Sequence, residues 1–224
     1  MAEMKQPPSA VATVIGDVVG SRTAPDRSHL HGRLSEVLAR ANDLLHPVVA
    51  LRVTVGDEFQ GCFATVGEAV HATLWLRLHL VPEADLRHGI GWGEVSVLAE
   101  EPRVEDGPGW WAARDAIEAV KADASRPATR LVRTAYHRAA GVGADTGPDP
   151  RPVNAALLCR DHVVGSVAGK SEGRALRLLR GTIDGRSQAE LAEQEGISAS
   201  AVSQRIRNDG LAVVLAADEL MRGV

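Results

Sequence analysis

The sequence lacks the features that mark secreted, disulfide-stapled and membrane-embedded proteins. Its 224 residues include only two cysteines, Cys62 and Cys159. They lie far apart in apolar surroundings, which argues against a disulfide framework and matches no zinc-ligand spacing. No apolar run approaches the roughly 20 residues that span a bilayer, and the polar residues 1–9 lack the apolar core of a signal peptide. We therefore expect a cytoplasmic protein with no membrane partner.

An excess of positive charge is also absent. The net charge is −4 at pH 7, and residues 170–210 hold seven basic side chains against six acidic ones. DNA affinity depends strongly on contacts from Lys and Arg to phosphate. Any affinity for DNA must therefore come from where the charges sit, and a weak single site would need two copies of the chain. The eight histidines are scattered without the spacing of a zinc site.

The hydrophobic pattern divides the first part of the chain into strands and helices. Short β-branched apolar runs favour strands, while apolar residues spaced three and four apart favour helices. In chain order the pattern predicts a strand at 11–19, a helix at 30–45, strands at 48–55 and 58–63, a helix at 66–80, a strand at 86–98 and a helix at 108–124. This β-α-β-β-α-β order followed by a helix predicts an α+β fold of the ferredoxin-like kind, an antiparallel sheet with helices on one face.

The rest of the chain divides into an edge element, a connection and a helical region. Residues 130–136 could add an edge strand, and residues 141–152 are rich in Gly and Pro, which favours a flexible connection. A helix at 153–167 could belong to either side of that connection. We expect an α+β domain over residues 10–150, then a helical linker and a small all-α domain over residues 151–224.

Signals for two successive helices follow in the C-terminal region, after a first short helix at 172–180. Ser187 and Glu190 have the spacing of a capping box, so a helix should begin there. Gly196 can supply a left-handed turn that ends it, and Ser198 can cap the next helix. The small Ala192 allows the two helices to approach closely. This segment resembles a bacterial helix-turn-helix.

The third of these helices would present a polar face. Ser200, Ser203, Gln204 and Arg207 share one side at helical spacing, with Arg205 beside them. In a major groove, Gln204 could pair with adenine, and Arg207 with guanine or phosphate. The competing interpretation is a helical hairpin used for packing or dimerisation. We favour double-stranded DNA as the partner, because packing does not require a fully polar recognition face.

Acidic residues fall at the ends of two strands that this order makes neighbours. Asp17 ends the first strand, and Asp57 and Glu58 lie in the following hairpin. Carboxylates that converge in this way can hold Mg²⁺ or Mn²⁺. Beside a phosphate site, such a metal suits attack of a 3′-hydroxyl on an α-phosphate. The alternative is that Gly56 and Asp57 form an ordinary hairpin turn, because both residue types are common in turns.

Several segments together resemble known families. Gly-Asp-Glu-Phe at 56–59, Leu-Arg-His-Gly-Ile-Gly-Trp-Gly at 86–93 and the helix at 113–121 that ends in a lysine resemble the palm shared by GGDEF diguanylate cyclases and class III nucleotide cyclases. Ile-Gly-Asp-Val-Val-Gly-Ser-Arg at 15–22, Asp-Gly-Pro-Gly-Trp at 106–110 and the terminal helix-turn-helix resemble the SatD family more specifically. That second resemblance extends over nearly the whole chain.

The resemblance implies roles for individual residues. Asp17 and Asp57 would hold the metal, the backbone of Val18 and Val19 would approach phosphate, and Lys121 would neutralise it. The full set implied for nucleotide binding adds Gly56, Glu58 and Arg114. Val55 stands where the diguanylate signature has Gly, a position that leaves room for the nucleotide, and this argues against synthesis of a cyclic dinucleotide.

The favoured hypothesis is a DNA-binding transcription regulator whose degenerate cyclase-like domain binds a nucleotide without turnover. The alternative is a metal-dependent nucleotidyl cyclase or transferase that uses a nucleoside triphosphate, with the C-terminal helices serving dimerisation. A third possibility is an interaction protein with neither activity. We also expect a homodimer, because a two-fold pair suits DNA and because several apolar side chains near the C-terminus need burial: Leu211, Val214, Leu215 and Leu220.

Overall fold

The computed structural model describes residues 10–101, 103–141, 147–168 and 173–224. The polar segment 1–9 and residues 142–146 of the predicted connection at 141–152 lie outside these described residues. Among the described residues, no helix combines the length and the apolar character needed to cross a membrane.

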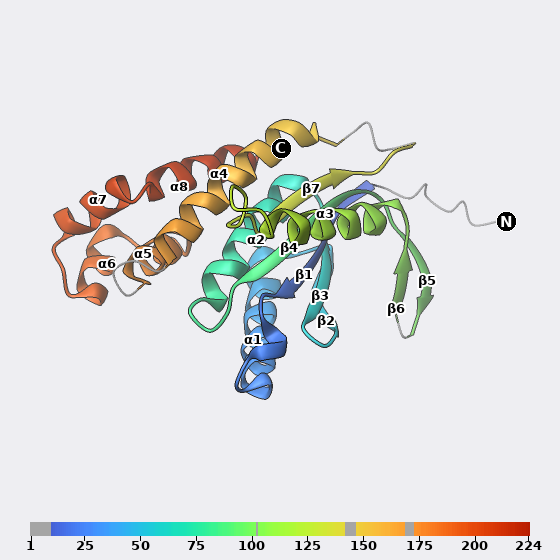
Figure 1. The fold of residues 1–224 in the computed structure, drawn as a ribbon, viewed down its shortest axis with the longest axis horizontal. Helices are drawn as coiled ribbons and strands as arrows, with labels where there is room; N and C mark the ends of the chain where they lie inside the picture. Colours follow the sequence, from blue (N-terminus) through green and yellow to red (C-terminus); the bar gives the residue numbers. More distant parts are fainter. Residues whose placement is uncertain (1–9, 102, 142–146, 169–172) are drawn as a thin grey trace.

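A five-stranded sheet forms the centre of the fold, with strand order β2-β3-β1-β4-β7 (Figure 1). Strand β1 pairs antiparallel with β3 and β4, whereas β7 pairs parallel with β4. The prediction of a wholly antiparallel sheet is therefore wrong. After β4 the chain crosses over through a helix, so that β7 runs in the same direction as β4. The strands of this sheet are β1 (Ala10–Val18), β2 (Val49–Val55), β3 (Glu58–Phe63), β4 (Leu86–Glu94) and β7 (Thr134–Arg138).

A separate two-stranded hairpin extends beyond the sheet and was not predicted. It consists of β5 (Ser96–Glu100) and β6 (Arg103–Asp106), which pair antiparallel (Figure 1). The single strand predicted at 86–98 joins β4 to the first part of this hairpin. Most hairpin residues are exposed, so they carry no alternation of apolar and polar side chains that could reveal the break.

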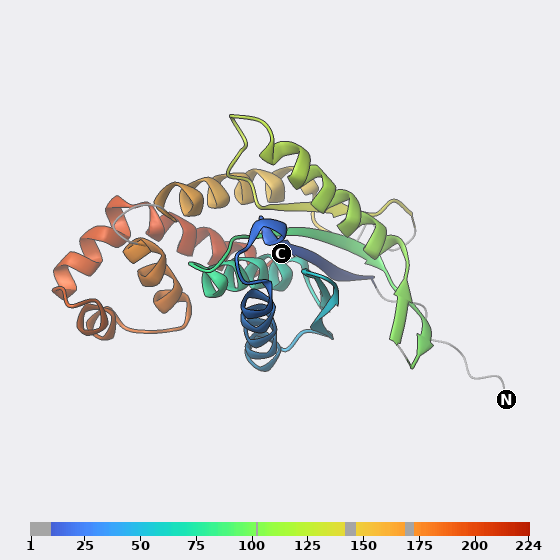
Figure 2. The same ribbon diagram turned by 60° about the horizontal axis from the view of Figure 1, so that its bottom comes forward.

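Helices cover both faces of the sheet, which corrects the prediction that they share one face. The helices α1 (Arg27–Leu45) and α2 (Val66–Leu80) cover one face, and α3 (Pro108–Ala124) lies on the opposite face (Figure 2). The short helix η1 (Ser21–Thr23) lies between β1 and α1 along the chain. Strand β1 shows why. Its Ala12 and Val14 join the core under α1 and α2, whereas Ile15 packs against α3 residues. A strand buried on both faces has no polar side to mark solvent.

Glycines in β4 allow α3 to lie directly on the sheet. A side chain at Gly89 would place its Cβ 2.2 Å from the carbonyl oxygen of Ala113, and one at Gly91 would lie 2.2 Å from that of Gly109. Thr13 uses the same close approach, because its hydroxyl donates to the Gly109 carbonyl at 2.8 Å. The glycine-rich pattern of this strand is thus explained by helix packing.

The C-terminal helices pack together, and some of them pack on α2. They are α4 (Pro150–Ala168), α5 (Arg174–Ile183), α6 (Gln188–Glu195), α7 (Ala199–Asn208) and α8 (Leu211–Met221). Leu74 and Leu78 of α2 belong to the core of these helices, while other residues of α2 face the sheet. Helix α2 is therefore apolar on nearly all sides, as expected of a helix in the interior. Helix α4 contacts β7 as well as α5 and α8.

Local signals in this region are confirmed at the level of single hydrogen bonds. The Ser187 hydroxyl accepts from the Glu190 backbone N–H at 3.3 Å, and Ser198 accepts from Ala201 at 3.2 Å. Gly196 is left-handed, with φ 63°. The first helix begins at Arg174, two residues later than predicted; the predicted start lies outside the described residues.

Burial of the C-terminal apolar side chains does not require a second copy in every case. Leu211 and Val214 are 0% and 1% exposed within the chain, where they join the core shared with α2. Leu220, in contrast, is 77% exposed. Exposure of Leu220 therefore favours a homodimer, whereas Leu211 and Val214 do not need one for their burial.

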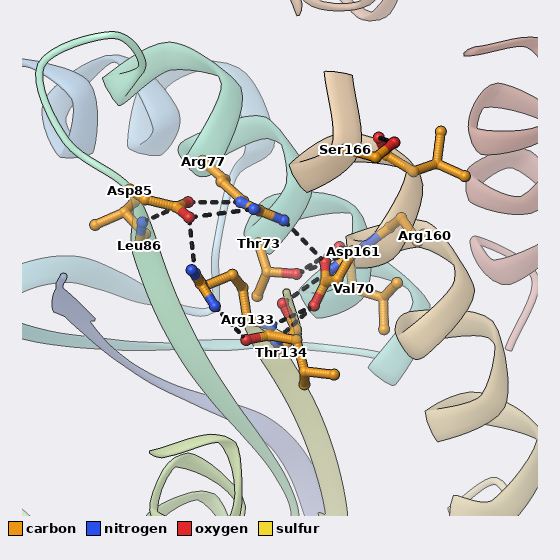
Figure 3. Close-up of polar contacts among 12 residues, drawn as sticks. Val70, Thr73, Arg77, Asp85, Leu86, Arg133, Thr134, Arg160, Asp161 and Ser166 are labelled. Atoms are coloured by element: carbon orange, nitrogen blue, oxygen red, sulfur yellow. Dashed lines mark hydrogen bonds and ion pairs between the residues drawn. The ribbon is translucent and has the colours of Figure 1, made fainter. Parts of the chain in front are cut away.

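A buried network of charges joins α2, α4 and the sheet (Figure 3). Asp161 of α4 is fully buried and accepts from the backbone N–H groups of Arg133 and Thr134 at 2.8 and 2.7 Å. Arg77 of α2 reaches both Asp161, at 3.3 Å, and Asp85, at 2.6 Å. Burial alone would raise the pKa of Asp85, but Arg77 and Arg133 together hold it below its ordinary value. The network fixes the residue that immediately precedes β4.

Candidate functional site

The end of β1, the start of β3 and the start of β4 lie at the same end of the sheet (Figure 1). Antiparallel pairing produces this arrangement, since Gly16 lies opposite Phe59 and Val18 opposite Leu86. Beyond β1 the chain turns at Gly20, whose φ of 74° is in the left-handed region that glycine adopts readily. The loop after β1 and the β2–β3 turn therefore lie together at this end of the sheet.

A cavity of about 410 Å³ lies at this end of the sheet. It is lined by Asp17, Val18, Gly20, Ser21, Arg22, Asp57, Arg87 and Lys121. The two carboxylates predicted to converge thus line the same cavity, although they come from β1 and from the β2–β3 turn. Lys121 reaches it from α3, on the far face of the sheet.

Asp17 is held by two cations. Its Oδ1 accepts from Arg87 Nε at 2.8 Å, and its Oδ2 lies 3.5 Å from Lys121 Nζ. Arg87 lies directly opposite Asp17 in the pairing of β1 with β4. Asp17 is therefore not an open metal ligand in this arrangement. A metal could take it only if another anion replaced it beside Arg87 and Lys121.

Glu58 and Arg114 are occupied with each other and do not line the cavity. Arg114 donates to both carboxylate oxygens of Glu58, at 2.7 and 2.8 Å. These hydrogen bonds hold the pKa of Glu58 below its ordinary value, although partial burial opposes the shift. The pair connects the β2–β3 hairpin to α3. The contact of these two residues with a nucleotide stays a prediction.

The backbone groups expected to approach phosphate also divide into two cases. The Val19 N–H donates to the Asp85 carbonyl at 2.9 Å, so it is already used within the fold. Val18 lines the cavity. Gly56 forms the β2–β3 turn with φ 64° and lines a neighbouring cavity of about 360 Å³, which shares Val18, Ser21 and Asp57 with the first.

The charges around the larger cavity favour an anion. Three cations line it, Arg22, Arg87 and Lys121, against the two carboxylates Asp17 and Asp57. Arg22 is exposed, and neither it nor Asp57 forms an ion pair with another described residue. Arg22 and Arg87 were not among the residues singled out from sequence. The strand order alone could have indicated Arg87, since it places a residue of β4 opposite Asp17.

The cavity fits a divalent metal only together with phosphate. Among the described residues, no three His, Cys, Asp or Glu side chains are grouped so that they could hold a metal ion. The two carboxylates supply at most part of a coordination shell. Mg²⁺ is commonly held by one or two carboxylates while substrate phosphates and water complete its octahedron. Asp17 and Asp57 could supply these one or two carboxylates.

The exposed side of α7 carries the polar residues predicted for DNA contact. Ser200, Gln204 and Arg207 are exposed, and Ser203 is partly exposed. The Arg207 guanidinium donates to the Ser203 hydroxyl at 3.0 Å. Arg205 lies 3.8 Å from Asp209 within the same helix end. The side chains therefore share one surface.

Comparisons with known proteins give one family and a distant likeness of shape. A family model described as the SatD family matches residues 11–139, and no curated protein matches the chain. A guanylyl cyclase, Cya2, is 14% identical over 52% of this chain and 73% of its own, with a TM-score of 0.41. A bacterial light-regulated adenylyl cyclase is 13% identical over 62% and 79%, with a TM-score of 0.43. Likenesses this distant carry no functional argument.

Proposed function

The chain belongs to the SatD family, and we propose that the cavity at the end of β1 binds a nucleotide polyphosphate together with Mg²⁺ or Mn²⁺. The observation that carries the proposal is that Asp17 and Asp57 line one cavity with three cations. Carboxylates alone would attract a bare metal, and cations alone would attract a bare anion. Their mixture suits a metal–polyphosphate complex, in which both charges are present.

The carboxylates and the cations of the cavity would bind different parts of the complex. Asp17 and Asp57 would hold the metal, which neutralises charge on the phosphate oxygens. Arg87 and Lys121, now on Asp17, would then donate to phosphate, and Arg22 at the mouth would add a third cation. Binding in this form is an exchange of partners, since each cation that leaves Asp17 gains a phosphate oxygen.

Isothermal titration of the full chain tests this function. We expect magnesium complexes of GTP, ATP and inorganic tripolyphosphate all to bind, because the cavity contacts the phosphates. Excess EDTA should weaken each of them by about tenfold, because the two carboxylates then face the phosphates without a metal. Failure of all three ligands to bind at millimolar concentration would overturn the proposal.

Nucleotidyl transfer is the alternative use of the same site. Paired carboxylates that hold a metal beside phosphate can activate a hydroxyl for attack on an α-phosphate. Incubation with labelled ATP and GTP plus Mn²⁺ distinguishes the two uses. A new nucleotide product that is absent with Asp57→Asn would establish an enzyme, and recovery of unchanged nucleotide would leave a binding protein.

We further propose that α6 and α7 form a helix-turn-helix that contacts double-stranded DNA as a homodimer. The specific observation is that Gly196, Ile197 and Ser198 separate the two helices, whose inner residues are buried while the α7 face is polar. In such a motif the second helix enters the major groove. The fusion of the two sites would make the protein a transcription regulator that responds to a nucleotide.

Arg207→Ala tests the DNA contact. The variant should lower DNA affinity by about tenfold, because one exposed guanidinium at a base or phosphate is lost. Fluorescence anisotropy with mixed-sequence duplexes at low salt measures the effect, and Arg126→Ala, an exposed arginine at the end of α3, is the matched control. Absence of duplex binding by the unaltered protein, with and without nucleotide, would contradict the proposal.

A further inference from the structure

Helix α8 is apolar around its whole circumference, yet the chain covers only one side of it. Nine of its eleven residues are apolar, and the other two are acidic. Leu211 and Val214 are buried against the neighbouring helices, whereas Val213 and Leu220 are 67% and 77% exposed. A helix that is apolar on all sides is usually buried on all sides, as α2 is. The outer side of α8 has no such cover within the described part of the chain.

The uncovered side is a narrow stripe that is symmetric about its centre. Four residues recur at the spacing of one helix face, large at both ends and small between them: Val213, Ala216, Ala217 and Leu220. When two such stripes pack antiparallel about a two-fold axis, Val213 meets Leu220 of the second copy and the alanines face each other. Alanines allow the two helix axes to approach to about 8 Å. The stripe is thus complementary to itself, as a two-fold interface requires.

The charges around this stripe argue against a membrane or a nucleic acid as its occupant. Arg222, just beyond α8, donates to Asp218 at 3.1 Å and lies 3.2 Å from His71 Nε2, so its charge is already used on the covered side. Glu219 is the one exposed charged residue of the helix. A membrane surface or a DNA backbone would favour Lys or Arg beside the apolar residues. An uncharged protein surface, such as the stripe itself, fits better.

The chain has little else that could cover the stripe. The residues outside the described ranges are 1–9, 102, 142–146 and 169–172. Apart from proline, their only large apolar residues are Met1, Met4 and Val142. None of these segments has enough apolar residues to match a whole helix face. A second copy of the chain supplies such a surface in full.

We propose that the chain forms a homodimer in which α8 packs antiparallel on α8 of a second copy, about a two-fold axis between Ala216 and Ala217. This contact goes beyond the proposed function, because it needs neither nucleotide nor DNA. A single helix pair buries less than the roughly 800 Å² per partner of a standard interface, so the dimer should dissociate in the micromolar range. Helix α7 directly precedes α8, so the pair also relates two α7 helices by the symmetry that two DNA half-sites require.

Sedimentation velocity of the full chain tests the interface. The unaltered protein should change from monomer to dimer between low micromolar and millimolar concentration. Leu220→Glu should raise the dissociation constant at least about tenfold, because the two-fold axis places the new charge in the contact twice. Leu98→Glu is the matched control, since Leu98 is 66% exposed on β5, and it should leave the dissociation constant unchanged. A monomer at all concentrations, or equal weakening by both variants, would overturn the proposal.

Disulfide cross-linking tests the antiparallel arrangement. Cys159 is exposed and Cys62 is buried, so a Cys159→Ser background keeps only the buried thiol. In that background, Ala216→Cys should form a linked dimer with oxidised glutathione, because both copies of residue 216 lie beside the axis. Ala212→Cys, also exposed on α8, is the control. Antiparallel packing separates its two copies by about 14 Å along the helix, beyond the reach of a disulfide. Linkage at 212 but not at 216 would overturn the arrangement.

These outcomes are independent of those for the proposed function. A dimer that loses its association with Leu220→Glu but binds neither nucleotide nor DNA would support this contact and contradict the proposed function. Nucleotide binding by a chain that stays monomeric would do the reverse.

Discussion

Asp17→Asn is expected to abolish the strengthening of nucleotide binding by magnesium. In the unaltered protein, Mg²⁺ should strengthen binding, because Asp17 and Asp57 attract the metal while they repel bare phosphate. The substitution keeps the shape of the side chain but removes its charge. Arg87 and Lys121 then lose the anion that they share. Metal-free GTP should bind about tenfold more tightly than it binds the unaltered protein, and Mg²⁺ should no longer help.

Titrations with excess EDTA and with Mg²⁺ measure both halves of this prediction. Asp115→Asn is the matched control, because Asp115 is an exposed carboxylate of α3 that lines neither of the two cavities. A purely structural role for Asp17 would weaken metal-free and metal-bound GTP equally, accompanied by a lower midpoint of thermal unfolding. Retention of the magnesium effect in Asp17→Asn would equally contradict its role as a metal ligand.

Asp161→Ala is expected to cost about 3–5 kcal/mol of unfolding free energy. The carboxylate is fully buried, and its loss leaves the guanidinium groups of Arg77 and Arg160 buried with less compensation. Two backbone N–H groups, of Arg133 and Thr134, also lose their acceptor (Figure 3). Such a loss is a large part of the stability of an ordinary domain.

Urea denaturation measures this loss, with Asp123→Ala as the control. Asp123 pairs with Arg126 at the exposed end of α3, so its removal should change the unfolding free energy by less than about 1 kcal/mol. Should Asp161→Ala fail to fold, Asp161→Asn keeps one acceptor oxygen and should show a smaller loss. Equal losses at positions 161 and 123 would show that the buried network adds nothing to stability.

The elements that sequence predicted best are those set by neighbours along the chain. Ser187 with Glu190, Gly196 and Ser198 define helix ends within a few residues, and the structure confirms each of them. The predicted helix at 153–167 is also present, as α4. These features depend on local hydrogen bonds and backbone conformation, which a short stretch of sequence contains.

Features that depend on distant pairing were missed. The parallel position of β7 and the placement of α3 on the far face follow from the crossover, which no local pattern records. The glycines at 89 and 91 had a second interpretation, as part of a cyclase-like strand, whereas the structure shows that they make room for α3. A strand packed on both faces offers no alternation from which the face could be read.

The candidate site likewise has parts that sequence predicted and parts that depend on distant pairing. The predicted order of strands placed Asp17 and Asp57 at the same end of the sheet, and in the structure both line one cavity. The ion pair of Arg114 with Glu58 joins residues 56 positions apart, so sequence alone gave no sign that these two side chains pair. Arg22 was missed because an arginine in a polar loop carries no periodic signal.

Crystals grown with Mn²⁺ and a non-hydrolysable GTP analogue test whether a metal–nucleotide complex binds between Asp17 and Asp57. Anomalous scattering locates the manganese without reference to the protein density. We expect a peak between these two carboxylates and the phosphates, with Arg87 and Lys121 turned from Asp17 to phosphate oxygens. A nucleotide bound elsewhere, or no peak while both cations remain on Asp17, would contradict it.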